Sequence, residues 1–427
     1  MPSIMDLPME LKGLVLKALS RIGRVSSLAL VWRETWHDIR TARFQYIDLD
    51  DYKSRSVRLP RLLGIIKTAP EVALYIKEID VGEGGDWTLN GVPCHWSEEE
   101  GILENLASLI NVARCADELW LRRMSPSIPL ECPQYSVLKA AFQASSIRHL
   151  HLYQYIFTSP AKLLEFIDWF PLAESIDMYD GRVESQEGLD ESQRVQSLSQ
   201  HAQITSMALT YASDADVRFL QLIADQPLFP DVQSFAMSCY DFNFIPTLRR
   251  LLVQWSATLT SLELPFLIPR YVPIGVAPLQ LPPTLTTLDV SVRLVKGQQS
   301  CIEFITSTLL QNQAIGKLML VVRYSYQCAH LMTPEEIDAI ARLDTAVVER
   351  VEFLEWEGIL ARPCTCTSRD VPTCVFQDVC RTADEWMFKQ ALPKVTEKFF
   401  AGMPIPEPGD FHRGPFATRE HWSYDSN

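Results

Sequence analysis

The chain has 427 residues and a formal net charge of −14, and hydrophobic and aromatic residues make up 47% and 10% of it. This composition excludes a disordered chain and predicts two or three domains or one elongated repeat array. The acidic balance argues against nucleic acids and anionic membranes as partners, because both carry negative charge.

Signals for secretion and membrane insertion are missing from the sequence. The first residues lack the apolar stretch of a signal peptide, and the longest uncharged stretch, residues 271–288, contains four prolines that prevent a spanning helix. Most of the ten cysteines stand singly in apolar runs, as reduced thiols do in cytosolic and nuclear proteins. We therefore expect an intracellular protein, cytoplasmic or nuclear, with no membrane partner.

Residues 1–43 carry apolar side chains at helical spacing and show no strand-like alternation. Seven basic residues against four acidic ones give this segment a charge of +3, so the rest of the chain carries −17. A compact helical module is expected to precede an acidic region.

Several short motifs follow one another in this module: Leu7-Pro8, Glu10-Leu11, Val15-Leu16, Leu19, the run Ser27–Val31, Arg33 and Trp36. In these residues the module resembles the F-box, a three-helix motif that docks a Skp-family adaptor and links a substrate receptor to a cullin-based ubiquitin ligase. The resemblance implies that the adaptor-binding residues are Leu7, Pro8, Leu11, Val15, Leu19, Val31 and Trp36. The alternative is a plain helical cap that shields the first repeat.

From residue 44 onward one pattern recurs: an apolar residue, two others, an apolar residue, one other, and an apolar residue. It occurs eleven times at intervals of about 30 residues. The apolar positions are Phe44, Ile47, Leu49; Ile76, Ile79, Val81; Ala116, Leu119, Leu121; Ile147, Leu150, Leu152; Ala173, Ile176, Met178; Ile204, Met207, Leu209; Val232, Phe235, Met237; Leu259, Leu262, Leu264; Leu285, Leu288, Val290; Ile315, Leu318, Leu320; and Val348, Val351, Phe353. Each match predicts a short strand.

Helix signals lie between many of these strands. Ser159-Pro160 is a typical helix start, and Thr333-Pro334 with Glu336 forms a capping box. Further helices are expected after Ser97, after Ser213 and from Cys301, whereas residues 275–285 are too rich in proline for a helix.

The repeated strand and helix predict an α/β solenoid over residues 44–360, because one repeat cannot bury its apolar face alone. This region resembles an irregular leucine-rich repeat, with a parallel sheet on a concave face and helices on a convex face. Segments after residue 60 and residue 162 also resemble those that follow the F-box in many fungal F-box proteins.

Within each predicted strand, the residue between the second and third apolar positions points to the concave face. This row contains Asp48, Asp80, Trp120, His151, Asp177, Ala208, Ala236, Glu263, Asp289, Met319 and Glu352. Six of the eleven are acidic, more than composition predicts. We expect a client with a basic segment to bind at Asp80, Trp120, His151, Asp177, Glu263, Asp289 and Glu352, with His149, Tyr153, Tyr179 and Tyr240 as further contacts. The alternative is a solvated acidic face.

Two groups of residues raise the question of a metal. His149 and His151 share a strand face without an identifiable third ligand, which favours an ordinary surface pair. Cys364, Cys366, Cys374 and Cys380 either hold a structural zinc or are free or reversibly oxidised thiols, and their spacing, which lacks C-x2-C pairs, favours thiols. We expect no cofactor.

Residues 361–400 are expected to form a cysteine-containing loop and a capping helix, and residues 401–427 a proline-rich tail. No nucleotide-binding or hydrolase motif occurs, so we expect no enzymatic activity and no catalytic residue. The resemblances imply a substrate receptor of a cullin-type ubiquitin ligase. The alternative is a non-degradative interaction scaffold with a degenerate F-box.

Overall fold

The computed structural model describes residues 36–49, 54–82, 101–123, 133–183, 203–212, 214–239, 244–264, 276–294, 299–312, 315–324, 333–360 and 391–399. The chain divides into two compact units, Met1–Phe229 and Pro230–Asn427, which we call unit 1 and unit 2. The F-box-like residues Leu7, Pro8, Leu11, Val15, Leu19 and Val31 lie outside the described residues, as do the four clustered cysteines and the proline-rich tail.

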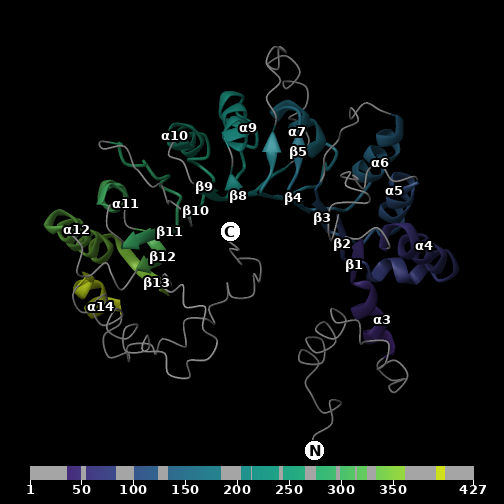
Figure 1. Ribbon diagram of the computed structural model, residues 1–427, viewed down its shortest axis with the longest axis horizontal. Helices are drawn as coiled ribbons and strands as arrows, with labels where there is room; N and C mark the ends of the chain where they lie inside the picture. The colour runs from purple at the N-terminus through teal and green to yellow at the C-terminus, as the bar shows by residue number, and fades with distance from the viewer. Residues whose placement is uncertain are drawn as a thin grey trace, which may run out of the picture. The chain divides into compact units, whose positions relative to one another are not determined.

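Unit 1 alternates short strands and helices (Figure 1). Its described elements are α3 (Trp36–Phe44), β1 (Tyr46–Leu49), η3 (Ser54–Arg58), α4 (Leu59–Thr68), η4 (Pro70–Tyr75), β2 (Glu78–Val81), α5 (Ile102–Val112), β3 (Glu118–Arg122), α6 (Pro133–Gln143), β4 (His149–Tyr153), β5 (Ile156–Phe157), α7 (Pro160–Ile167), β6 (Ser175–Tyr179), β7 (Arg182–Val183), β8 (Ser206–Ala212) and α9 (Asp214–Asp225).

Unit 2 repeats the same alternation with longer strands toward its end. Its described elements are β9 (Ser234–Cys239), α10 (Ile245–Gln254), β10 (Ser261–Leu264), β11 (Thr287–Leu294), α11 (Gln299–Gln311), β12 (Ile315–Tyr324), α12 (Pro334–Arg350), β13 (Val351–Leu360) and α14 (Pro393–Phe399). Helix α14 packs on α12, where the buried carboxylate of Asp344 accepts hydrogen bonds from the backbone N–H groups of Lys394 and Val395.

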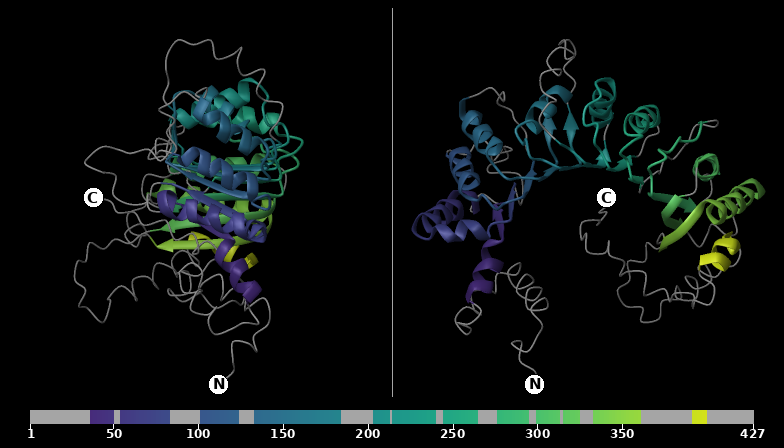
Figure 2. Two further views of the ribbon diagram at one scale, coloured as in Figure 1. Left: turned by 90° about the vertical axis from the view of Figure 1, so that its right-hand side faces the viewer. Right: turned by 180° about the vertical axis from the view of Figure 1, so that it is seen from behind.

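Neighbouring strands pair in parallel and follow chain order, as β1-β2-β3-β4-β6-β8 in unit 1 and β9-β10-β11-β12-β13 in unit 2. Strands β5 and β7 form a separate parallel pair. Within each unit the helices lie along one side of the strands (Figures 1 and 2). We call the other side the front face. Parallel strands need such crossover connections, and the predicted α/β repeat with a parallel sheet is confirmed for the described residues.

The strand pattern is confirmed for ten of its eleven matches, in which the second and third apolar residues lie inside a strand and are both buried. The last match is wrong by three residues. Helix α12 continues to Arg350, and the register pairs Ile315 with Val351 and Leu318 with Leu354. Phe353, which was expected in the core, is 58% exposed. The apolar pattern of β13 therefore begins at Val351.

The expected helix starts are also found in α7 and α12. The Ser159 hydroxyl accepts a hydrogen bond from the N–H of Lys162, and Thr333 and Glu336 form both bonds of the capping box. Residues 276–282 form neither helix nor strand, as their prolines predict. Side chains of α11 hold this segment, because Thr308 and Asn312 accept hydrogen bonds from the N–H groups of Leu279 and Leu281.

Hydroxyl groups join successive repeats at the start of the strands. In three repeats the Ser or Thr before the first apolar residue donates to the carbonyl of the first apolar residue of the preceding repeat. These pairs are Ser146 with Ala116, Thr258 with Val232, and Thr284 with Leu259. The bonds satisfy carbonyl groups that the strand ladder leaves free and so stabilise the stacking of repeats.

None of the described helices is both long and apolar enough to cross a membrane.

Candidate functional site on the front face of unit 1

Strand register places four of the expected client-binding residues side by side on the front face of unit 1. Asp80 of β2 pairs with Trp120 of β3, Trp120 with His151 of β4, and His151 with Asp177 of β6. Because side chains two residues apart share a face, Glu118, Arg122, Tyr153 and Tyr179 lie on the same side. We call these eight residues and Tyr46 of β1 the front-face cluster.

His151 lies at the centre of the front-face cluster. Its Nε2 atom is 3.2 Å from Oε1 of Glu118, and its Nδ1 atom is 3.0 Å from Oδ2 of Asp177. Only 8% of the residue is exposed. The two carboxylates come from the strands on either side of β4, so the imidazole is held between neighbouring repeats.

These contacts determine the charge of His151. Burial by itself lowers the pKa of His151, but the carboxylates of Asp177 and Glu118 beside its two ring nitrogens outweigh burial and raise the pKa to about 9. The same pairing with His151 lowers the pKa of Glu118. At neutral pH the ring is therefore an imidazolium with a carboxylate at each nitrogen.

Trp120 stacks on this imidazolium. The ring centroids of Trp120 and His151 are 3.9 Å apart with an interplanar angle of 9°, and the indole Nε1 donates to Oε1 of Glu118 at 2.8 Å. Two tyrosines extend the aromatic surface: the Tyr179 ring is 6.3 Å from Trp120 and 6.4 Å from Tyr153. All three rings are half-buried, so part of each remains accessible from the front face.

Arg122 joins the aromatic rings to a buried acid. Its guanidinium binds Asp80 through two hydrogen bonds of 2.9 and 2.6 Å, and it also lies 5.7 Å from the Trp120 ring and 6.0 Å from the Tyr153 ring. Asp80 is 1% exposed and also accepts a hydrogen bond from the hydroxyl of Tyr46. Burial raises the pKa of Asp80 against the opposing effects of Arg122 and Tyr46, and burial beside Asp80 raises the pKa of Tyr46.

A glycine makes room for this arginine. A Cβ atom at Gly82 would lie 2.5 Å from Cβ of Arg122, so a larger residue there would displace the arginine side chain. Beyond the strand ends, Arg123, Gln154 and Asp180 all have a left-handed backbone with φ of 59°, 52° and 49°. Their side chains form a ladder, because Arg123 donates to Gln154 and Gln154 donates to Asp180.

The expected row continues in unit 2 with a different composition. Ala236, Glu263, Asp289 and Met319 are neighbours in register, and Asp289 is buried. Glu352 does not belong to this row, because the residue paired with Met319 is Glu355. The cause is the shift of β13 described above.

Three findings differ from the sequence interpretation. The pair His149 and His151 is not a surface pair, because His151 is buried between two acids. Asp80 and Asp177 contact cationic groups of the chain itself. Glu118, Arg122 and Tyr46 were not expected in the site, although the period of two along each strand places them on the same face as the expected residues.

Metal binding finds no support in the part of the chain that the structure describes, which contains no group of three or more His, Cys, Asp or Glu residues suited to a metal ion. The four clustered cysteines fall outside these residues.

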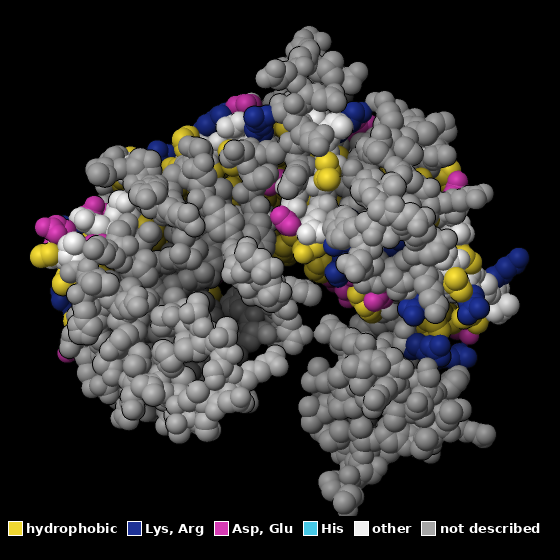
Figure 3. All heavy atoms as spheres, in the orientation of Figure 1, with side chains coloured by type: hydrophobic (Ala, Val, Ile, Leu, Met, Phe, Trp, Pro, Cys, Tyr) yellow, Lys and Arg dark blue, Asp and Glu magenta, His cyan; other side chains and the backbone are white. Residues whose placement is uncertain are grey.

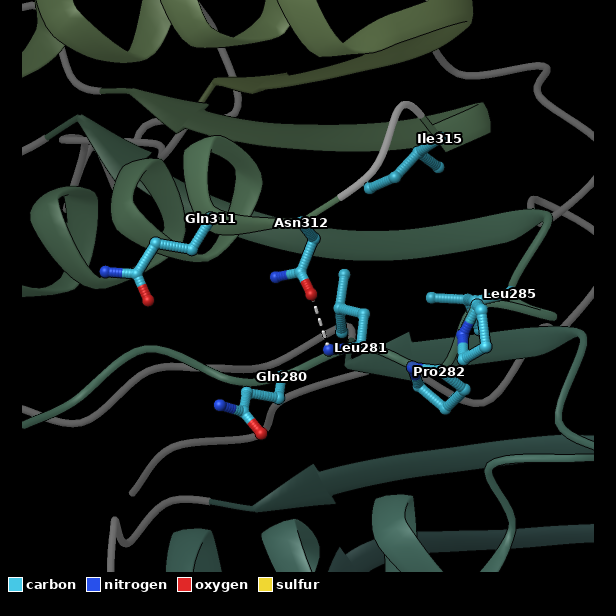
Figure 4. Close-up of a pocket in the computed structure, with 8 residues that line it drawn as sticks. Gln280, Leu281, Pro282, Leu285, Gln311, Asn312 and Ile315 are labelled. Carbon is cyan, nitrogen blue, oxygen red and sulfur yellow. Dashed lines mark hydrogen bonds between the residues drawn. The ribbon is translucent and has the colours of Figure 1, made fainter.

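A pocket of about 320 Å³ opens in unit 2 beside residues 276–282 (Figure 4). Its lining consists of Gln280, Leu281, Pro282, Pro283, Leu285, Gln311, Asn312 and Ile315. The amide of Asn312 is bound to the backbone of Leu279 and Leu281, and none of the lining side chains is titratable at physiological pH. The pocket therefore lacks groups for acid–base catalysis.

No protein-family model matches the chain, and no curated protein matches it.

Proposed function

We propose that this chain is a substrate receptor of a cullin-type ubiquitin ligase, in which the front face of unit 1 binds the client. The observation that supports a docking surface is the front-face cluster, where Trp, Tyr and Arg side chains lie together and are held in place by ion pairs. These three residue types dominate the binding energy of protein interfaces. The leucine-rich-repeat likeness of residues 44–360 agrees with such a role.

Adaptor binding by residues 1–43 rests on their resemblance to the F-box. The first described helices next to this segment carry a basic surface, visible in dark blue beside α3 and α4 in Figure 3. Its residues include Arg43, Arg58, Arg61 and Lys67, all exposed. These exposed cations lie in the sequence directly after, or at the end of, the segment proposed to bind the adaptor.

Co-purification with a Skp-family adaptor tests the adaptor function. Leu7→Ala with Pro8→Ala should abolish binding of the adaptor by the full-length chain. Pro171 and Leu172 provide a matched control, because they are another adjacent pair of Pro and Leu and Leu172 is 52% exposed. The control variant Pro171→Ala with Leu172→Ala should retain the adaptor. Wild-type protein that fails to bind any Skp-family adaptor would favour a non-degradative scaffold instead.

Client capture from the native cell, followed by identification of the bound proteins, tests the receptor function. Trp120→Ala should reduce capture of the principal partner at least about tenfold, because truncation of a hot-spot aromatic residue costs about 2 kcal/mol or more and about 1.4 kcal/mol already corresponds to tenfold. Val253→Ala, at a side chain that is 68% exposed on α10, is the control and should leave capture unchanged. Equal capture by both variants contradicts a role for the front-face cluster.

A further inference from the structure

If the front face of unit 1 is the docking surface, as proposed above, the charge of the front-face cluster limits which client segments can bind there. Its three carboxylates, Asp80, Glu118 and Asp177, each contact a cationic group of the chain: Arg122 for the first and His151 for the other two. Within the cluster, two cations against three carboxylates leave a single net negative charge. Asp48 and Glu78 lie on the same face at its β1 and β2 edge and are not part of this sum.

Access to these carboxylates is limited as well. Asp80 is 1% exposed, and the side chain of Asp177 is 18% exposed while it holds His151. A lysine or arginine of a client would have to displace Arg122 or His151 to reach them. Such a displacement breaks one ion pair within the chain in order to form another with the client, so the net gain in free energy is small. The acidic row of the sequence is therefore a poor guide to the charge of the client.

The accessible parts of the cluster are aromatic. Trp120, Tyr153 and Tyr179 are half-buried rings. The Tyr179 ring lies within 6.4 Å of both others, and Arg122 lies near Trp120 and Tyr153. One side of the indole is already stacked on a cation, the His151 imidazolium, at 3.9 Å. Several protein domains use adjacent aromatic rings to bind proline-rich segments, which are extended before binding and lose little conformational entropy.

We infer that the front-face cluster binds an uncharged, proline-rich segment of the client that also carries aromatic or aliphatic side chains. The rings of Trp120, Tyr153 and Tyr179 contact the prolines, and the ion pairs beneath them keep the rings in place. Recognition is through apolar contact and is insensitive to salt, in contrast to capture of a basic segment.

Random peptides displayed on phage, selected on the immobilised full-length protein and counter-selected on its Trp120→Ala variant, test this inference. The retained peptides should be rich in proline and poor in Lys and Arg. Synthetic copies should bind with affinities that change less than about twofold between low and high salt. Trp120→Ala and Tyr179→Ala should each weaken binding about tenfold or more, and Val253→Ala should not.

Every other outcome of the selection is informative. Lys- or Arg-rich peptides that depend on Trp120 and lose affinity in salt overturn the inference but leave the proposed docking surface intact. Acidic peptides do the same. Peptides that bind equally well to Trp120→Ala and Tyr179→Ala, or no binding peptides, overturn both the inference and the docking surface. Should Trp120→Ala fail to fold, Trp120→Phe and Tyr179→Ala replace it.

Discussion

The front faces of units 1 and 2 share one backbone plan and differ in chemistry. In unit 1 five adjacent strands contribute to a connected set of rings and ion pairs around His151 and Trp120. In unit 2 the corresponding described positions of β9 to β11 are held by Ser234, Ala236, Ser261, Glu263, Thr287 and Asp289. Phe353 is the one aromatic residue at a described front-face position of unit 2.

The strands differ in length as well. Strands β1 to β4 and β6 have four or five residues, whereas β11, β12 and β13 have eight, ten and ten. The apolar side chains that face the helices are alike in both units, since they must fill the same space between strand and helix. The front face carries no such constraint and is where the two units have acquired different properties.

The largest loss of stability is expected at the ion pair of Arg122 and Asp80, on the front face of unit 1. Arg122→Met leaves a buried carboxylate without its cation and should lower the free energy of unfolding by about 3–5 kcal/mol, measured by chemical denaturation. Arg148→Met is the matched control, because its partner Glu174 is exposed, and it should cost at most about 1 kcal/mol. Equal losses would show that burial does not govern the pair.

His151 should make stability depend on pH. Its pKa of about 9 in the folded protein exceeds the value of 6.5 expected when unfolded, so its contribution is complete below pH 6.5 and is lost as the pH rises through 9. This shift corresponds to roughly 3 kcal/mol. Denaturation of the wild type and of His151→Gln across this range should show a difference that shrinks with rising pH. A constant difference contradicts the assignment, and NMR titration of the ring measures the pKa directly.

Gly82 should be intolerant of a side chain because of its closeness to Arg122. Gly82→Ala should cost about 1–3 kcal/mol, the usual range for overpacking. Gly64→Ala on α4 is the control: its Cβ meets nothing within 4 Å, and alanine in a helix should increase stability by about 0.5–1 kcal/mol. Denaturation midpoints that move in the same direction for both variants would contradict this reading.

The smallest expected effect belongs to the hydroxyl groups that join successive repeats, two of which lie in unit 2. Thr258→Val and Thr284→Val each remove a bond to the preceding repeat and should cost about 1 kcal/mol. Thr68→Val should cost less, because its hydroxyl bonds only within its own helix. The melting temperatures of the three variants provide the comparison. An equal decrease in all three would show that the hydroxyl groups do not stabilise the contact between repeats.

Much of the fold was predictable because each repeat carries local signals. The period of two in the strands, the caps at Ser159 and Thr333 and the prolines of residues 275–285 act within a few residues of the chain. The register of β13 was not predictable in this way. Val348, Val351 and Phe353 match the strand pattern, but Val348 lies in the last turn of α12, which ends at Arg350.

The candidate site was predictable in its position but not in its electrostatics. Alternation along the strands alone determined that Asp80, Trp120, His151 and Asp177 share one face, because the backbone dictates where each side chain points. Only the tertiary structure decided that His151 forms ion pairs with both Glu118 and Asp177. It also decided that Arg122, packed beside Gly82, binds Asp80 of the preceding strand. These partners are about 26 to 42 residues apart in the chain and meet only when parallel strands stack about 4.8 Å from each other, a spacing that brings opposite charges into contact.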